Sequence, residues 1–359
     1  MFRMNCDNHD EPAVCSFRSL TAIAWPDRSY EDARPFLTGL VFDLRKKLEH
    51  DAAGPTLLTT HPGQGYALAV RPFCAIRARS PFVAGPPILE PSAFFGRVRE
   101  VERLLRLWTR RPLHSALIIG ARRSGKTSLL HYMKALTRTP SSLLRPDQAR
   151  WWASHTSSDG VAVPATLRMA YVDFQDPRTG TAEYVLGEIL RGCGLPSTGA
   201  CEYGDFIAIA SSQLDAPTVV LLDEVDKGLR RPGLAELWGT LRSAASRHPR
   251  QLLAFAVACR AIPAVENSTP YESPLLNIIG EVIELGPFTR EEATELIAAS
   301  PRTFPDADVE WMLEQSECWP ALLQVFCDTR LSAFDTDDEG GWRQHALLRA
   351  RQWLHLKQR

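Results

Sequence analysis

Short apolar runs rich in β-branched residues recur through the middle of the chain, and longer amphipathic stretches separate them. Apolar runs of this length, bounded by turn residues, are typical of buried strands. Strands that alternate with helices predict an α/β fold, in which helices cover both faces of a parallel sheet. The predicted strands are residues 115–119, 167–174, 218–226, 252–259 and 281–285.

Apolar residues at helical spacing fill the intervals between these runs and continue after the last one. Thr289-Arg-Glu-Glu292 reads as a capping box, and Ala293, Leu296 and Ile297 form the apolar face of the helix that it starts. We therefore expect a helical lid and C-terminal helices over residues 288–359. The predicted helices are 128–136, 182–192, 232–245, 309–315 and a basic helix at 342–357.

The N-terminal part has a different pattern. A helix is predicted from Pro35 to Leu48, with Pro35 in its first turn. Two strand-like runs, at 56–60 and 66–70, flank a turn at 62–65 and predict a β-hairpin. Residues 1–71 thus form a small α+β domain. Its predicted apolar helical face consists of Phe36, Leu37, Leu40, Val41, Leu44 and Leu48.

Two segments lack this regularity. Five prolines lie within residues 72–94 among Arg, Ser, Ala and Gly, which predicts a stiff interdomain linker. Residues 138–164 are rich in Ser, Pro, Arg and Trp, which predicts an exposed excursion from the central domain.

Charge and composition exclude several functions. Lys and Arg total 41 and Asp and Glu total 42, so only a local basic patch could attract nucleic acid. The longest apolar run, residues 252–259, is far shorter than the roughly 20 residues that span a bilayer. The eight cysteines are scattered, without the close spacing of a zinc site. With no secretion signal at its start, the chain is expected to be cytoplasmic.

The main chemical motif follows the first predicted strand. Residues 120–127 read Gly-Ala-Arg-Arg-Ser-Gly-Lys-Thr, the G-x-x-x-x-G-K-T pattern of a phosphate-binding loop between a strand and a helix. In such a loop Lys126 neutralises the terminal phosphates and the Thr127 hydroxyl binds Mg²⁺. We therefore expect ATP and Mg²⁺ as ligands. The expected loop contacts are Gly120, Ala121, Arg122, Arg123, Ser124, Gly125, Lys126, Thr127 and Ser128.

The third predicted strand ends in three carboxylates. We expect a strand beside the loop to deliver Asp223 to the Mg²⁺, and Glu224 to act as the general base on the attacking water. Glu224 and Lys126 are thus the candidate catalytic residues, while Asp226 is expected to be exposed. Arg260, after the fourth strand, is either a γ-phosphate contact or a solvated arginine.

From Phe95 to about residue 334 the chain resembles the STAND class of AAA-related P-loop ATPases. The resemblance rests on Phe95-Gly96-Arg97, the phosphate loop, Leu-Leu-Asp-Glu at 221–224 and Trp-Pro-x-Leu-Leu-Gln at 319–324. It implies a P-loop NTPase doubly wound parallel sheet at 95–287 with a C-terminal helical lid. It also implies nucleotide contacts from Phe95, Gly96, Arg97 and Pro320. The glycines that precede the proline in that class are replaced here by Glu317 and Cys318.

Residues 16–71 resemble the C-terminal half of an OmpR/PhoB-type winged-helix DNA-binding domain. Leu-Arg-Lys-Lys-Leu at 44–48 and Gly-Gln-Gly-Tyr at 63–66 carry this resemblance, which implies a partial, degenerate winged helix. It implies contacts with double-stranded DNA, and the candidate cations are Arg34, Arg45, Lys46 and Lys47. The middle of the helix is apolar or acidic instead of polar, as at Leu40, Phe42 and Asp43.

Together these features predict an ATP-hydrolysing switch that regulates transcription or a defence response through DNA. The resemblance also implies a nucleotide-dependent homo-oligomer. The alternative is an ATPase switch whose N-terminal module makes only protein contacts. A metabolic phosphotransferase is the third class, and no second substrate motif supports it.

Overall fold

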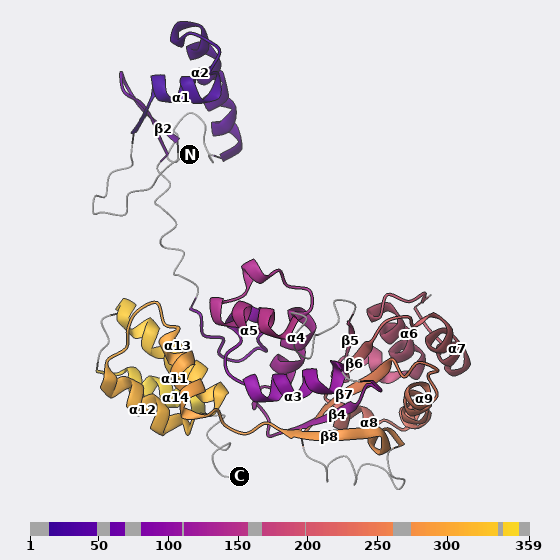
Figure 1. Ribbon diagram of the computed structural model, residues 1–359. Coiled ribbons are helices and arrows are strands. Elements are labelled where there is room, and N and C mark those ends of the chain that lie inside the picture. The colour runs from indigo at the N-terminus through magenta and orange to yellow at the C-terminus, as the bar shows by residue number, and fades with distance from the viewer. Residues whose placement is uncertain are drawn as a thin grey trace. The chain divides into compact units, whose positions relative to one another are not determined.

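The computed structural model divides into two compact units, residues 1–79 and 80–359, and each is described here by itself (Figure 1). No described helix has both the length and the apolar character needed to cross a membrane. The described residues are 14–48, 58–68, 80–109, 111–156, 167–197, 199–260, 274–336 and 340–351.

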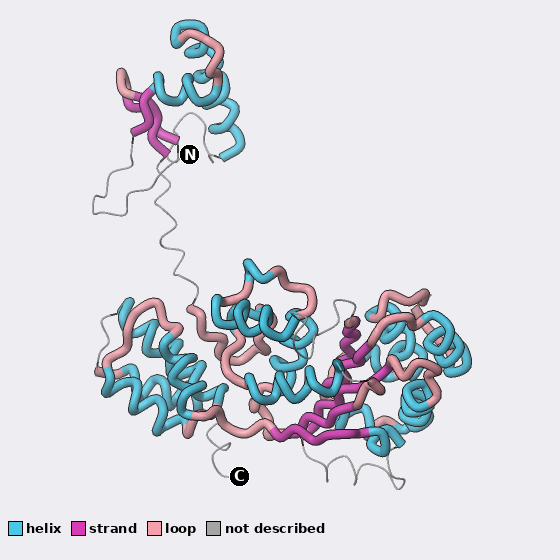
Figure 2. Tube along the Cα trace, in the orientation of Figure 1, coloured by secondary structure: helices cyan, strands magenta, loops and turns pink. Residues whose placement is uncertain are grey.

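A five-stranded parallel sheet forms the centre of the second unit (Figure 2). The predicted doubly wound α/β architecture is confirmed. The strand order is β5-β6-β7-β4-β8, so β7 separates the strand before the phosphate loop, β4, from the carboxylate strand, β6. β4 and β6 are therefore not neighbours, but the end of β6 reaches the phosphate loop, where Thr127 is hydrogen-bonded to Asp223. The strands are β4 (Ser115–Ile119), β5 (Arg168–Asp173), β6 (Thr218–Asp223), β7 (Leu253–Cys259) and β8 (Ile279–Glu284).

Helices cover both faces of this sheet because its strands bury side chains on each side. Along β4, Ala116 and Ile118 pack with α3 (Val98–Thr109), α4 (Lys126–Leu136) and α5 (Pro146–Thr156). Leu117 belongs instead to the core on the other face. That core is completed by α6 (Ala182–Gly192), α7 (Tyr203–Gln213), α8 (Val225–Leu229) and α9 (Ala235–Ser246).

The predicted excursion at 138–164 contains a helix, α5. Gln148 lies near its start and is buried, where its Oε1 accepts a hydrogen bond from the Arg145 backbone amide. Its Nε2 donates to the carbonyls of Pro91 and Phe94, at 2.8 and 3.1 Å. The polar composition of the segment did not indicate this helix, because one of its buried residues is a glutamine that forms hydrogen bonds with the backbone of residues 91 and 94.

The predicted linker at 72–94 requires correction. Residues 80–94, which we call the proline strap, belong to the second unit and pack on it. Phe82 and Phe94 are buried, and the Val83 amide donates to Gln324 Oε1 at 2.8 Å. The Ile88 amide donates to Ser128 Oγ at 3.1 Å. Buried aromatic rings and paired amides hold the strap in place, whatever its proline content. Residues 72–79 lie outside the described part.

The lid consists of four helices after the sheet, and its predicted capping box is present at Thr289 and Glu292. Its core includes Phe304, Leu322 and Phe326 together with Phe82 of the strap. The last predicted helix, 342–357, is observed from Trp342 to Ala350, and residues 352–359 lie outside the described part. The lid helices are α11 (Arg290–Ala298), α12 (Asp306–Ser316), α13 (Pro320–Thr336) and α14 (Trp342–Ala350).

The N-terminal unit has a helix followed by a β-hairpin, as the pattern predicts. Its helix α2 begins at Tyr30 rather than Pro35, because Ser29 Oγ accepts a hydrogen bond from the Asp32 amide. Pro35 lies inside the helix. Its small antiparallel sheet has the order β1-β3-β2. The elements are β1 (Val14–Ser16), α1 (Phe17–Ala24), α2 (Tyr30–Leu48), β2 (Leu58–His61) and β3 (Gly65–Leu68).

The apolar face predicted for this helix is only partly buried. Leu37 and Val41 pack with Leu58 and Tyr66. Phe36, Leu40 and Leu44 are exposed, so the row that faces the hairpin is narrower than the sequence pattern indicated.

Candidate nucleotide-binding site

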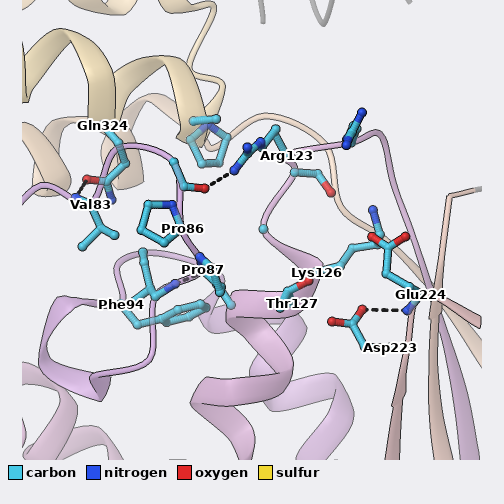
Figure 3. A pocket seen from close by; sticks show the side chains of 18 of the residues that line it. Val83, Pro86, Pro87, Phe94, Arg123, Lys126, Thr127, Asp223, Glu224 and Gln324 are labelled. Atoms are coloured by element: carbon cyan, nitrogen blue, oxygen red, sulfur yellow. Dashed lines mark hydrogen bonds between the residues drawn. The ribbon is translucent and has the colours of Figure 1, made fainter. Parts of the chain in front are cut away.

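A cavity of about 440 Å³ lies where the phosphate loop, the strand ends, the proline strap and the lid meet (Figure 3). Its size falls within the roughly 300–1,000 Å³ typical of small-molecule sites. Many of the residues expected from the sequence line it: Phe95, Arg97, Arg122, Arg123, Ser124, Gly125, Lys126, Thr127, Ser128, Asp223, Glu224, Arg260 and Pro320.

Three expected contacts do not line the cavity. Gly120 and Ala121, the first two residues of the loop, are not among its lining residues, and Gly96 lines a neighbouring cavity of about 300 Å³. Gly120 has a steric role, because a Cβ there would come within 2.7 Å of both the Leu285 carbonyl and Ser124 Oγ. We infer that Gly120 shapes the loop without touching the ligand.

The loop conformation leaves polar groups available. Gly125 has a φ of 97°, in the left-handed region that glycine adopts without strain, and α4 begins immediately after it. Ser124 Oγ is buried, and within the described part of the chain it has no hydrogen-bond partner. A buried hydroxyl without a partner fits a site completed by an external acceptor such as a phosphate oxygen.

Lys126 is the first residue of α4, and its side chain reaches the cavity (Figure 3). Its Nζ donates to the carbonyls of Gly120 and Ala121, at 2.8 and 3.0 Å. Burial lowers the pKa of Lys126, while Glu224 and Asp223 oppose this effect. A phosphate would supply the buried ammonium group with an anionic partner.

Asp223 ends β6 and is almost fully buried. Its Oδ1 accepts a hydrogen bond from the Glu224 amide at 2.9 Å, and its Oδ2 accepts one from the Tyr171 hydroxyl at 3.0 Å. Burial raises the pKa of Asp223, and hydrogen bonds from Thr127 and Tyr171 counteract it. The Thr127 hydroxyl and the Asp223 carboxylate thus meet across the end of the sheet, as expected for two ligands of one cation.

The same edge of the sheet carries another carboxylate. Asp173 ends β5 directly opposite Asp223 in the strand register and also lines the cavity. Among the described residues, no cluster of three or more His, Cys, Asp or Glu side chains could hold a metal ion. This donor set fits Mg²⁺, which usually takes one or two carboxylates and completes its shell with water and phosphate oxygens.

Glu224 has a backbone φ of 52°, a left-handed conformation that is uncommon outside glycine. Non-glycine residues with this conformation cluster at functional sites. Its Oε2 lies 3.7 Å from Nζ of Lys227, three residues further along the chain. Glu224 and Lys227 both line the cavity. The Glu224 carboxylate also interacts electrostatically with Lys126 of the loop.

Arg97 acts mainly on the protein itself. Its guanidinium donates to the carbonyls of Ser124 and Gly286, and the side chain is buried. Burial lowers the pKa of Arg97, and Glu100 opposes this effect. Although Arg97 lines the cavity, these bonds give it the role of fixing the loop against the end of the sheet.

Sequence reasoning missed the apolar wall of the site and part of its polar rim. The strap and the lid supply the wall, and strand ends supply the rim. A detectable signal existed for Asp173 and Gln175, because both lie at the carboxyl end of the strand predicted at 167–174. The missed lining residues are Val83, Gly85, Pro86, Pro87, Ile88, Phe94, Asp173, Gln175, Lys227, Phe288, Ala321 and Gln324.

Charge and apolar surface lie on different elements of the cavity. The cations come from Arg97 before α3, from the loop, from α8 and from the end of β7, whereas the strap and lid contribute proline, aliphatic and aromatic groups. Gln324 is the polar lining residue of α13, and its Oε1 is bonded to the strap (Figure 3). Such a site suits a ligand with an apolar planar end and an anionic end.

The turn before α13 retains a glycine-like backbone. Glu317 and Cys318 have φ values of 48° and 57°. The Cys318 carbonyl accepts a hydrogen bond from the Phe288 amide at 2.9 Å, which ties the turn to the segment after β8. Pro320 and Ala321, just after this turn, line the cavity.

Comparisons with known proteins agree on the architecture. No family model and no curated protein matches the chain. The Walker-type ATPase PabY2304 of Pyrococcus abyssi is 18% identical, with a TM-score of 0.53 over 76% of this chain and 77% of that one. The ORC2 protein of Aeropyrum pernix, as ADPNP–ADP complexes, is 17% identical, with a TM-score of 0.53 over 68% and 66%.

The chain has a P-loop NTPase fold. Its second unit combines the parallel sheet, a G-x-x-x-x-G-K-T loop at the end of β4 and a helical lid. At this level of identity the likeness shows the fold alone, so the ligand and the activity have to be inferred from the residues of the site.

Proposed function

We propose that this P-loop NTPase unit binds ATP with Mg²⁺ and hydrolyses it slowly, as a STAND-type switch. The observation that carries the proposal is a single cavity in which Lys126 faces Asp223 and Glu224, with an apolar wall at the other side. PabY2304 is described as an ATPase, and the Aeropyrum ORC2 complexes hold ADPNP and ADP. Both descriptions agree with ATP as the ligand.

Each polar residue then has a role in hydrolysis. Lys126 stabilises the negative charge on the terminal phosphates, and Arg260, at the end of β7, approaches the same charge. Thr127 and Asp223 would hold Mg²⁺, which when bound neutralises charge on the phosphate oxygens. Glu224 accepts the proton of the attacking water as general base.

The lid gives the site its switch character. Gln324 and Pro320 lie on α13, at the face of the lid that lines the cavity, so a bound nucleotide touches the lid and the sheet together. A ligand shifts a conformational equilibrium only by its differential affinity for the two states. We infer that ATP favours the closed arrangement, that hydrolysis weakens it, and that a nucleotide-dependent homo-oligomer assembles from the closed form.

Two substitutions test the activity. Lys126→Ala should abolish ATP binding, because the phosphates lose their buried cation. Glu224→Gln should retain binding and reduce hydrolysis at least about 100-fold, within the usual contribution of a general base. Binding is measured by calorimetry and turnover by phosphate release. Parent-like turnover in either variant would disprove the assignment.

The N-terminal unit has two candidate roles, DNA binding and protein contact. Arg45, one of the expected DNA contacts, donates from Nε and Nη2 to the Leu58 carbonyl and from Nη2 to Thr60 Oγ1. Its guanidinium therefore braces the hairpin. Arg34 and Lys46 are exposed, and the side chain of Lys47 lies outside the described part. Because Phe36, Leu40, Phe42 and Leu44 are also exposed, protein contact is favoured.

A further inference from the structure

Exposed apolar side chains are concentrated in the N-terminal unit. Eleven large apolar side chains are exposed among the described residues, and six of them belong to this much smaller unit. Single exposed apolar side chains are ordinary, but a row of them on one element marks an interaction surface. The six are Val14, Ile23, Phe36, Leu40, Phe42 and Leu44.

Three of these side chains form a straight row on α2. Phe36, Leu40 and Leu44 are spaced by four residues and are 49%, 44% and 38% exposed. Residues at this spacing form a ridge of the kind that packs into the groove of another helix. We call this row the α2 stripe. It is about 12 Å long at 1.5 Å per residue.

Contacts within the unit hold one end of the stripe in place. The Phe36 ring lies 6.1 Å from the Trp25 ring, and the Arg28 guanidinium lies 4.4 Å from its centroid. At the other end of the helix, Arg45 is bonded to the hairpin. The stripe is therefore presented by a braced helix, and little ordering is needed to bind a partner.

The charges of α2 indicate what covers the stripe. Its beginning carries Glu31 and Asp32 with one cation, Arg34, and is net acidic, whereas its end carries Arg45, Lys46 and Lys47 with one carboxylate, Asp43, and is net basic. A second α2 that runs antiparallel would place each acidic end beside a basic end, whereas a parallel one would place like charges together. A two-fold axis at Leu40 also maps the stripe onto itself, with Phe36 against Leu44 of the second copy.

We propose that the α2 stripe is a self-association surface, on which the α2 helices of two copies pack antiparallel about Leu40. This inference rests on the proposed protein-contact role of the N-terminal unit but not on ATP hydrolysis. The interface is isologous, as in most two-fold dimers. One helix stripe covers less than the roughly 800 Å² per partner of a standard interface, so the contact is weak alone. Assembly of the nucleotide-bound units raises its effective concentration.

Engineered cysteines in the full chain test the geometry. Disulfides form only where Cα atoms come within about 7 Å, so the pattern of bonding reports the register. Under mild oxidation Leu40→Cys should cross-link to itself. Phe36→Cys and Leu44→Cys should each form no cross-link alone but should cross-link to each other when mixed. The parent chain, with its native cysteines, is the control.

Two further outcomes would overturn the proposal. A Phe36→Cys chain that bonds to itself would mean parallel pairing, and absence of any stripe disulfide, with or without ATP, would mean that another surface covers α2. Mass in solution gives an independent measure. Leu40→Glu should reduce association at least about 10-fold by sedimentation, whereas Ile23→Glu, on exposed α1, should leave it unchanged.

Duplex DNA and ATP turnover separate the remaining explanations. If Leu40→Glu abolishes a salt-dependent affinity for DNA and leaves the mass unchanged, the stripe is a DNA-facing surface and the proposal fails. ATP turnover of every stripe variant at low protein concentration should match the parent. Failure of self-association with normal turnover would refute this inference alone and leave the proposed ATPase intact.

Discussion

At the scale of single residues, Asp223 shows how a side chain placed for ligand binding lowers the stability of the nucleotide-free protein. Its carboxylate is 1% exposed and sits at the end of a fully buried strand, with Asp173 opposite it. The Tyr171 hydroxyl and the Glu224 amide bind its two oxygens. Burial nevertheless raises the pKa of Asp223, so keeping the carboxylate ionised in the folded protein costs free energy. A bound cation would remove that cost.

Asp223→Asn should therefore stabilise the nucleotide-free protein at pH 7–8. The pKa of Asp223 is higher in the folded state than in the unfolded state. The protonated side chain therefore favours folding at low pH, and this contribution to stability is lost as the pH rises through the pKa of the folded state. The gain from Asn should shrink as the pH falls toward 4. Thermal melts across this range measure it.

The same variant should lose the stabilisation that Mg–ATP gives the parent, because it lacks the metal-binding carboxylate. That loss is the internal control for a change at the intended site. A lower melting temperature for Asp223→Asn at pH 7.5 would contradict the argument and would mean that the hydrogen bonds of the carboxylate outweigh its burial.

The parts of the site that could be predicted are those whose residues are consecutive in the sequence. The phosphate loop lies in eight consecutive residues, so its ligand chemistry could be predicted from the sequence. Lys227 and Gln175 enter the cavity from α8 and from the turn after β5, and only the sheet order brings them together. Asp226, expected to be exposed, is buried because it lies in the short helix α8 against the sheet.

At the scale of elements, composition was a poor guide where side chains of one segment serve another. Prolines in residues 80–94 indicated a linker, but the rings of Phe82 and Phe94 anchor the strap. Phe94 stacks on Tyr132 of α4 with ring centroids 4.2 Å apart. Long-range contacts of this kind leave no local periodicity. The inner strands were predictable because each buries a continuous apolar run, as β6 and β7 do along their whole length.

The turn before α13 combines strain with function. Non-glycine residues in the left-handed region cost about 1–2 kcal/mol each relative to glycine. Glu317 and Cys318 are consecutive residues of this kind, and Pro320 follows them at the cavity. The chain therefore keeps the backbone path of a glycine turn without its glycines.

Cys318→Gly should raise the free energy of unfolding by up to about 1 kcal/mol, since relief of strain exceeds the added entropy of the unfolded glycine. In a unit of this size that corresponds to about 2–4 °C in melting temperature. Cys318→Ala is the matched control, because alanine keeps the strain. An equal gain in both variants would attribute the effect to loss of the thiol.

At the scale of the whole molecule, the boundary between the units separates self-sufficient cores. The core of the N-terminal unit, around Leu37, Val41 and Tyr66, shares no residue with the sheet or lid cores. The proline strap, in contrast, shares the lid core through Phe82 and the sheet core through Phe94. Nucleotide binding should therefore depend on the strap and not on the N-terminal unit.

Two fragments should separate these contributions. Residues 80–359 should melt cooperatively and bind Mg–ATP within about 2-fold of the full chain, because every described wall of the cavity is retained. Residues 95–359 lose Phe82 and Phe94, and burial of each ring contributes about 1.5–3 kcal/mol. They also lose Val83, Pro86, Pro87 and Ile88, which are part of the apolar wall.

We expect the shorter fragment to melt at lower temperature and to bind ATP at least about 10-fold more weakly, a difference of about 1.4 kcal/mol. Titration with a fluorescent ATP analogue, beside melts of each fragment, measures both effects. The triphosphate group alone, offered as inorganic tripolyphosphate, should bind the two fragments with similar affinity, because the loop is common to both. Equal ATP affinity in folded samples of the two fragments would show that the strap is only a tether, and the apolar end of the nucleotide would then have to be held by Phe288 and the lid.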